Sequence, residues 1–168
     1  TGNLVEFEFC GKSGVDHCIA IKDKQIARIV QRCSELPGYS VFQYLDEDGT
    51  RQRVDSDDVN GYLQTLSGED FTAKEFRTWA GTVLTTQTLG ESQPDPSETK
   101  AQQQITAAIK AVAKRLGNRP ATCRKYYVHP KIPEFYLTGE LSATLMAAQQ
   151  CSTDLSCHEL AVLRILEK

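Results

Sequence analysis

The sequence predicts a mostly helical α+β fold with a small antiparallel sheet at its N-terminal end. Within residues 4–10, apolar and acidic side chains alternate, and a Gly-Lys-Ser-Gly turn at 11–14 separates them from a second strand-like run at 17–21. Most apolar residues further along recur with the 3.6-residue period of a helix. The 168 residues contain no repeat or low-complexity tract, and at this length one compact domain with its own core is expected.

The composition is that of an ordinary globular protein, with 40% hydrophobic and 24% charged residues. No apolar run approaches the roughly 20 residues that a membrane-spanning helix needs, so we expect no membrane partner. The chain starts at Thr1 and reaches the first strand pattern without the basic and apolar segments of a signal peptide, as in a protein truncated or processed at its front. These features favour a cytoplasmic protein.

Six cysteines are scattered without a C-x-x-C pair, and the three histidines show no metal-ligand spacing with them. Reduced thiols are therefore expected. The nearest approach to a metal cluster is Cys151, Cys157 and His158, whose fourth ligand is not apparent, whereas a structural zinc site needs four. The sequence predicts no metal site.

The first helix is predicted to follow Asp23, an N-cap residue, and to stop near Pro37. Its apolar positions follow the helical period: Ile26, Ile29, Val30 and Cys33. A short strand at 41–45 and a turn at 48–49 are expected next. A second helix then begins at Ser56, and four of its side chains are expected to face inward: Val59, Tyr62, Leu63 and Leu66.

The clearest helix start lies at residues 71–76. Thr72 and Glu75 have the spacing of a capping box, and the phenylalanines at the two ends of this stretch can pack together. This start fixes Arg77 on the first turns of a helix that is expected to run to about Leu89.

Another helix start is predicted at residues 95–98, with Asp95 as the cap, Pro96 at the first helical position and Glu98 completing the capping box. The buried stripe of this helix is expected to be Ile105, Ile109, Val112 and Leu116. Gly117 is expected to end it, so that a tight turn carries Asn118.

The end of the chain gives two further predictions. Residues 122–127 fit either a short helix or an extended segment, bounded by Pro120 and Pro130. Another capping-box pattern, in which Glu159 lies three residues after Ser156, predicts the final helix. This helix bears Leu160, Leu163 and Leu166.

Charges are distributed unevenly along the chain. The formal net charge of -3 argues, taken alone, against a nucleic-acid partner. Residues 99–133, however, contain eight Lys or Arg and no acid, whereas residues 46–70 contain eight acids and two arginines. The basic segment suits a polyanion such as duplex DNA, and a solvated helix face is the alternative interpretation.

Four residues form a set that phosphodiester transfer would use. They are Lys12 in the hairpin loop, Arg77 near a capped helix start, Asn118 after a helix end and Tyr127 within the basic segment. A tyrosine oxygen can form a covalent phosphodiester, cations and amide donors can hold the non-bridging oxygens, and a lysine can protonate the leaving alkoxide. The ordinary alternatives are a turn residue, a surface ion-pair partner, a helix terminator and a core tyrosine.

Three segments carry a resemblance that covers nearly the whole chain in order. They are residues 7–14 with His17, residues 71–80, and residues 116–121 followed by 124–130. Together they resemble the C-terminal catalytic region of bacterial and poxvirus-like type IB topoisomerases, whose fold resembles that of the tyrosine recombinases. The Gly-Lys-Ser-Gly piece by itself is not a phosphate-binding loop, because its upstream glycine spacing is wrong.

This resemblance implies a role for each residue of the set. Tyr127 matches the nucleophile that becomes joined to the 3′ phosphate, and Tyr126 is its competitor by residue type. Asn118 matches a position that is His in the poxvirus enzymes and Asn in some bacterial ones, where it would bond a non-bridging oxygen. Arg77 matches one of two arginines that clamp the scissile phosphate, and Lys12 matches the general acid for the 5′ oxygen.

DNA contacts are also implied. Lys74 matches a family lysine that contacts DNA, and the basic segment adds three expected DNA-binding residues: Arg124, Lys125 and Lys131. The family's other catalytic arginine and its amino-terminal DNA-clamping domain lie upstream of the hairpin, where this chain has no counterpart. We therefore expect residues 1–168 to be part of a catalytic domain that cleaves poorly alone, since one lost charge donor commonly costs on the order of 10²- to 10³-fold in rate.

The implied activity is relaxation of supercoiled duplex DNA by single-strand cleavage, strand rotation and resealing through a 3′-phosphotyrosyl intermediate. No nucleotide, metal or other cofactor is expected, because the covalent bond keeps the energy and cationic side chains take the role that metals have elsewhere. A monomer associated with the nucleoid is expected. Two rivals remain: a tyrosine recombinase, which has His-x-x-Arg where this chain has Lys74-Glu75-Phe76-Arg77, and a DNA-binding module without the chemistry.

Overall fold

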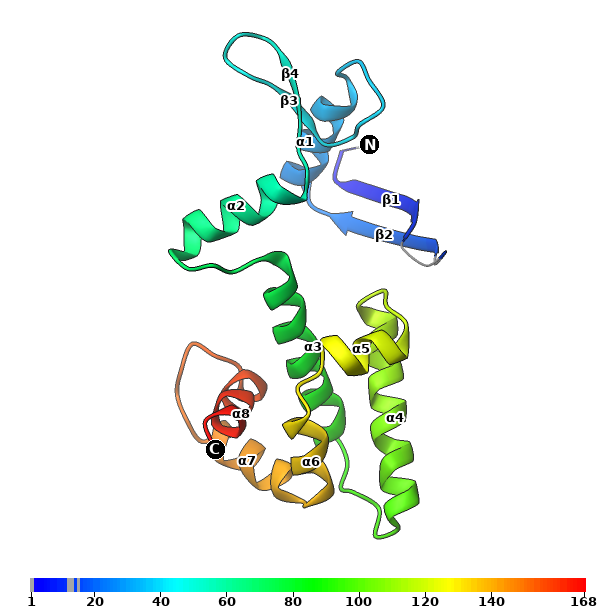
Figure 1. Ribbon diagram of the computed structural model, residues 1–168, viewed down its shortest axis with the longest axis vertical. Helices are drawn as coiled ribbons and strands as arrows, with labels where there is room; N and C mark the ends of the chain where they lie inside the picture. The colour runs from blue at the N-terminus through cyan, green and yellow to red at the C-terminus, as the bar shows by residue number, and fades with distance from the viewer. Residues whose placement is uncertain (1, 12–13, 15) are drawn as a thin grey trace. The chain divides into compact units, whose positions relative to one another are not determined.

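The computed structural model describes residues 2–11, 14 and 16–168. The chain divides into two compact units, unit 1 (Thr1–Ala73) and unit 2 (Lys74–Lys168). Its described part is mostly helical and has short antiparallel strands near the N-terminal end, so the predicted fold class is confirmed (Figure 1). The assignment of all 168 residues to one catalytic domain stays a prediction. Among the described residues, no helix combines the length and the apolar character needed to cross a membrane.

Unit 1 begins with the predicted hairpin. Strand β1 (Leu4–Cys10) pairs antiparallel with β2 (Asp16–Lys22), in a register that sets Phe7 opposite Ile19. Along each strand, successive side chains point to opposite faces of the ribbon. The predicted loop residue Lys12 lies outside the described residues.

Helix α1 (Lys24–Ser34) follows as predicted. The Asp23 carboxylate accepts hydrogen bonds from the backbone amides of Gln25 at 2.7 Å and Ile26 at 2.9 Å, which satisfies two of the free amides at the helix start. The helix packs against β1 and β2. The N-cap predicted from the sequence is therefore confirmed.

A second hairpin joins β3 (Gln43–Leu45) to β4 (Arg51–Arg53). The strand expected at 41–45 is confirmed but shorter, and β4 was not anticipated because all three of its residues are polar. The Asp46 carboxylate closes the turn by accepting bonds from the Gln52 side chain and the Thr50 amide, both at 2.8 Å. These bonds hold the pKa of Asp46 below its ordinary value.

Helix α2 (Ser56–Ser67) begins at the predicted residue, inside a capping box that Asp55 forms with Asp58. The expectation that four apolar side chains face inward was wrong for Val59, Tyr62 and Leu66, while Leu63 is partly buried. Tyr62 is 65% exposed, Leu66 is 67% exposed, and no residue of α2 is buried. Helical periodicity predicts an apolar stripe but not what covers it, and in unit 1 no described element covers this stripe.

Unit 2 is a bundle of six helices in its described residues: α3 (Ala73–Gly90), α4 (Glu98–Arg115), α5 (Pro120–Tyr126), α6 (Lys131–Leu137), α7 (Glu140–Gln149) and α8 (Cys157–Leu166). Helix α3 starts directly after Thr72, as predicted, while the roles of Thr72 and Glu75 as caps stay predictions. Figure 1 shows α3 and α4 running in opposite directions on either side of the loop that joins them.

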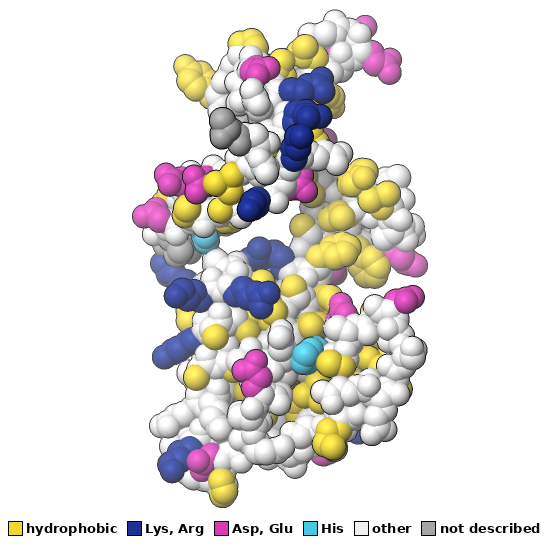
Figure 2. Space-filling model, turned by 180° about the vertical axis from the view of Figure 1, so that it is seen from behind, with side chains coloured by type: hydrophobic (Ala, Val, Ile, Leu, Met, Phe, Trp, Pro, Cys, Tyr) yellow, Lys and Arg dark blue, Asp and Glu magenta, His cyan; other side chains and the backbone are white. Residues whose placement is uncertain are grey.

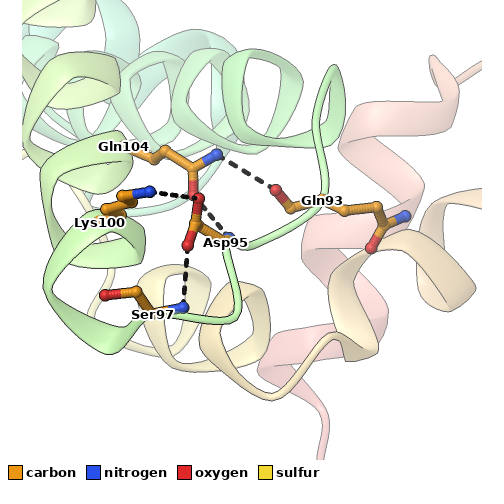
Figure 3. A network of polar contacts seen from close by, with 5 residues as sticks. All are labelled: Gln93, Asp95, Ser97, Lys100 and Gln104. Carbon is orange, nitrogen blue, oxygen red and sulfur yellow. Dashed lines mark hydrogen bonds and ion pairs between the residues drawn. The ribbon is translucent and has the colours of Figure 1, made fainter.

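The start of α4 differs from the prediction. The helix begins at Glu98, so the expectation of Asp95 as its cap and Pro96 as its first residue was wrong. The Asp95 carboxylate instead accepts the amide of Ser97 at 2.9 Å, while Gln104 accepts the Asp95 amide at 2.9 Å (Figure 3). Because this local turn uses the polar groups of Asp95, the chain enters the helix later than the capping pattern implies.

The core of unit 2 lies between its helices. The predicted stripe on α4 is confirmed, with Ile105, Ile109 and Val112 buried and Leu116 packed against the core at the edge. Helix α8 starts with the predicted capping box of Ser156 and Glu159 and buries the following side chains: Ala161, Val162 and Ile165. Its leucines 160, 163 and 166 are only partly buried.

Candidate active site

Tyr127 stands at the end of α5, the element that the sequence left open between a helix and an extended segment. It is a helix that begins at Pro120, and Tyr127 caps it by donating its backbone amide to the carbonyl of Cys123 at 2.9 Å. Tyr127 is partly buried and packs against the core, whereas Tyr126 is 52% exposed. The core thus fixes the backbone beneath Tyr127 and leaves Tyr126 on the surface.

Arg77 lies beside Tyr127. The guanidinium carbon of Arg77 is 5.4 Å from the centre of the Tyr127 ring, a cation–π distance. Its Nη2 donates to the backbone carbonyl of Leu116 at 2.7 Å. This carbonyl belongs to the C-terminal end of α4, where the helix dipole favours a positive charge.

Asn118 lies in the turn that ends α4. Gly117 adopts the left-handed conformation, with φ at 66°, and the amide of Asn118 donates to the carbonyl of Ala113 at 2.8 Å. The side-chain amide of Asn118 donates to the carbonyl of Leu116 at 3.3 Å. The prediction that Gly117 ends the helix and presents Asn118 in a tight turn is confirmed.

Three of the four predicted site residues therefore come together in unit 2. Arg77 and Asn118 both donate to the Leu116 carbonyl, and Arg77 also contacts Tyr127. The fourth, Lys12, lies outside the described residues. A tyrosine ring, a guanidinium and a side-chain amide are thus gathered near one helix end, and side chains of these types can form and hold a phosphodiester.

Sequence reasoning missed the residues on α3 that face Tyr127. Thr82 Oγ1 lies 3.5 Å from the carbonyl oxygen of Tyr127, and Thr78 Oγ1 lies 3.3 Å from that of Tyr126. Gly81 approaches the backbone of Tyr127 so closely that a Cβ there would overlap its carbonyl oxygen. The available signal was the spacing of these three residues, which puts them on one face of the helix.

Positive charge gathers on unit 2. Unit 2 holds twelve Lys or Arg and nine Asp or Glu, a net charge of +3, whereas unit 1 holds seven and thirteen, a net charge of -6. Figure 2 shows Lys and Arg side chains on the part of unit 2 that α4 and α5 form. The exposed cations of these helices towards the Tyr127 end are Lys110, Lys114, Arg115, Arg124 and Lys125.

The predicted DNA-binding residues have different surroundings. Lys74 is exposed on the first turn of α3, and Arg124 is exposed on α5. Lys125 is also exposed, with its Nζ 5.0 Å from the centre of the Tyr126 ring. Lys131 is partly buried and donates to the carbonyl of Leu166 at 3.4 Å, so it helps to close the end of α8.

A buried cysteine lies close to Tyr127 in the sequence. Cys123 lies one turn before Tyr127 and is fully buried, and burial raises the pKa of its thiol while the charge of Arg77 opposes that rise. In the part of the chain that the structure describes, no three metal-ligating side chains come together. Cys157 Sγ lies 3.7 Å from His158 Nδ1, and Cys151 accepts a bond from Arg164.

Two comparisons with known proteins bear on this site. The family model described as "Eukaryotic DNA topoisomerase I, catalytic core" matches residues 1–150. The protein "DNA topoisomerase 1B" of Acanthamoeba polyphaga mimivirus is 30% identical over 148 residues, which cover 80% of this chain and 44% of that protein. The chain therefore spans less than half the length of this relative, and both matches include the residues gathered around Tyr127.

Proposed function

Because the chain belongs to the type IB DNA topoisomerase family, we propose that it supplies the nucleophile and phosphate-binding groups of an enzyme that relaxes supercoiled duplex DNA. The observation that carries this proposal is the contact of Tyr127 with Arg77, together with the shared bond of Arg77 and Asn118 to Leu116. Arg77 is far from Asn118 and Tyr127 in the sequence, and the fold brings it to the helix end where they lie.

In the proposed reaction the Tyr127 Oη attacks the scissile phosphorus and gives its proton to solvent water. The bond from phosphorus to the 5′ oxygen breaks, a bond from phosphorus to the tyrosine oxygen forms at the 3′ phosphate, and Lys12 gives a proton to the departing 5′ oxygen. The free end rotates, and the 5′ hydroxyl then attacks the phosphotyrosine to restore the strand. One phosphodiester replaces another at each step, so no nucleotide is needed.

Arg77 and Asn118 are proposed to stabilise the charge that develops on the non-bridging oxygens. A guanidinium offers a planar pair of donors and an amide adds a neutral one, and donors fixed before the reaction need little rearrangement during it. Both side chains already donate to the Leu116 carbonyl, which holds them at the end of α4.

We expect the DNA backbone to contact the exposed cations of α4 and α5, which include Arg124 and Lys125, together with Lys74 and Lys131. Their charge lies on unit 2, so local binding is compatible with a chain whose net charge is -3. We further propose that the enzyme acts as a monomer on nucleoid DNA in the cytoplasm.

A tyrosine recombinase would use the same kind of nucleophile, and a DNA-binding module would use only the cations. To separate the three, the full-length protein is incubated with supercoiled plasmid, without ATP and with a chelator. A ladder of relaxed topoisomers that disappears in Tyr127→Phe supports the proposal. Binding without relaxation or a covalent adduct favours the module, and strand exchange between two sites without free relaxation favours the recombinase.

A further inference from the structure

The end of α5 lies against one face of α3. Gly81 and Thr82 lie three and four residues after Thr78 on α3, so the three positions share one face of the helix. The Thr82 hydroxyl lies 3.5 Å from the carbonyl oxygen of Tyr127, whereas the Thr78 hydroxyl lies 3.0 Å from the Lys74 carbonyl within α3 and 3.3 Å from that of Tyr126. Carbonyls at a helix end have no partner within the helix, and the Thr82 hydroxyl offers one to the Tyr127 carbonyl from a neighbouring helix.

Gly81 permits the closest approach between the two segments. A Cβ at this position would overlap the carbonyl oxygen of Tyr127 and lie 3.1 Å from both its carbonyl carbon and its Cβ. These are backbone and first side-chain atoms, which cannot turn away as the end of a flexible side chain can. An alanine at Gly81 must therefore displace the segment that carries Tyr127.

Thr82 differs from the other threonines further along α3. The hydroxyls of Thr85, Thr86 and Thr88 donate to carbonyls one turn back in the same helix, at 2.8, 3.0 and 2.8 Å. The hydroxyl of Thr82 instead accepts the amide of His129 at 3.2 Å and faces the Tyr127 carbonyl. Because Thr82 is only 3% exposed, water cannot easily replace these bonds.

We propose that Gly81 and Thr82 are positioning residues that set the direction of the Tyr127 hydroxyl. The proposal rests on the proposed role of Tyr127 as nucleophile. The bond from the Tyr127 amide to Cys123 holds the tyrosine on one side, and Gly81 and Thr82 hold it on the other. A misplacement of about 1 Å in a reacting group can cost about 10²-fold in rate, so small shifts of this segment are expected to slow cleavage.

The test compares two buried threonines of α3 in the full-length protein. Single-turnover formation of the covalent adduct on a nicked DNA substrate gives the cleavage rate constant, and the Kd for intact DNA is measured in parallel. Thr82→Val should lower the rate constant by about 10- to 10²-fold and leave the Kd unchanged. Thr82→Ser, which keeps the hydroxyl, should recover most of the rate, and the control Thr86→Val should cleave at the wild-type rate. Gly81→Ala should behave like Thr82→Val.

A second readout does not depend on catalysis. Hydrogen exchange at the His129 amide, measured without DNA, should be faster in Thr82→Val and normal again in Thr82→Ser, because that amide loses and regains its acceptor. Equal cleavage by Thr82→Val and Thr86→Val, or unchanged exchange at His129, overturns the proposal. An adduct that survives in Tyr127→Phe contradicts the proposed function instead, and the exchange at His129 then still decides whether Thr82 holds this segment.

Discussion

The guanidinium of Arg77 lies over the ring of Tyr127, with 5.4 Å between the Arg77 Cζ and the ring centre, while its Nη2 donates to the carbonyl of Leu116. One side chain of α3 thus contacts both the end of α4 and the residue that caps α5. A charge held by two fixed partners is already oriented before a phosphate arrives, which is the condition under which such a donor accelerates a reaction.

We predict that Arg77→Ala slows adduct formation on the order of 10²- to 10³-fold, since it removes a fixed donor to the phosphate. Arg77→Lys should recover only part of the rate, because a lysine is a point charge without the planar pair of donors. Arg77 is exposed, so the free energy of unfolding should fall by less than about 1 kcal/mol. Single-turnover kinetics and urea unfolding measure the two effects. The control is Lys168→Ala, which removes an exposed cation outside the proposed DNA-binding set, and an equal loss of rate there would contradict a specific role for Arg77.

Lys12 is predicted to act as a proton donor and not only as a charge. Lys12→Ala should slow cleavage of ordinary DNA strongly, because a 5′ alkoxide leaves badly without a proton. On DNA with a 5′-bridging sulfur the leaving group is a stable thiolate, so Lys12→Ala should recover most of the lost rate and Arg77→Ala should not. Equal recovery by both variants, or by neither, would show that this division of roles is wrong.

DNA affinity is predicted to fall steeply with salt despite the sequence pI of 5.6, because the cations of unit 2 release counterions from the DNA. Arg124→Ala and Lys125→Ala should each reduce the slope of log K against log salt by about one. Lys168→Ala is the control, since Lys168 pairs with Glu140 at 3.9 Å. A slope that stays the same in Arg124→Ala and Lys125→Ala would mean that these cations form a solvated face.

The capping box of α8 should contribute to stability in a pH-dependent way. Hydrogen bonds from the Ser156 hydroxyl and amide lower the pKa of Glu159 below its ordinary value of 4.5, so this contribution is present above that pH and is lost as the pH falls through the lower folded value. Ser156→Ala should therefore lower the free energy of unfolding by about 1 kcal/mol at pH 7 and by less in acid. Urea unfolding at both pH values measures this, with Ser152→Ala as control. A deficit that does not shrink in acid would contradict the part assigned to Glu159.

Local signals predicted the elements whose ends are fixed by a few neighbouring residues. Asp23, Gly117 and the Ser156 capping box each satisfy free backbone groups at a helix end, and each is confirmed. The prediction of Asp95 as a cap was wrong because its carboxylate accepts the Ser97 amide and its own amide donates to the Gln104 side chain of α4.

Two kinds of feature could not be predicted from the sequence. Helices α6 and α7 were not anticipated, since seven- and ten-residue helices give few turns in which a period can be recognised. The shared bond of Arg77 and Asn118 to Leu116, and the close approach of Gly81 to Tyr127, depend on tertiary packing between segments about 40 residues apart. Residue type and position suggested the four site residues as a set, and the resemblance gave each of them a role.

We predict that Tyr127, which is held by α5 and α3, is the residue that becomes joined to DNA. The most direct measurement is to trap the adduct on a nicked substrate with the full-length protein and identify the modified tyrosine by mass spectrometry of the digested complex. Tyr127 should carry the nucleotide, and Tyr127→Phe should form no adduct while binding DNA nearly as well, whereas Tyr126→Phe should form it normally. A nucleotide on the exposed Tyr126, or an adduct that persists in Tyr127→Phe and vanishes in Tyr126→Phe, would contradict the account.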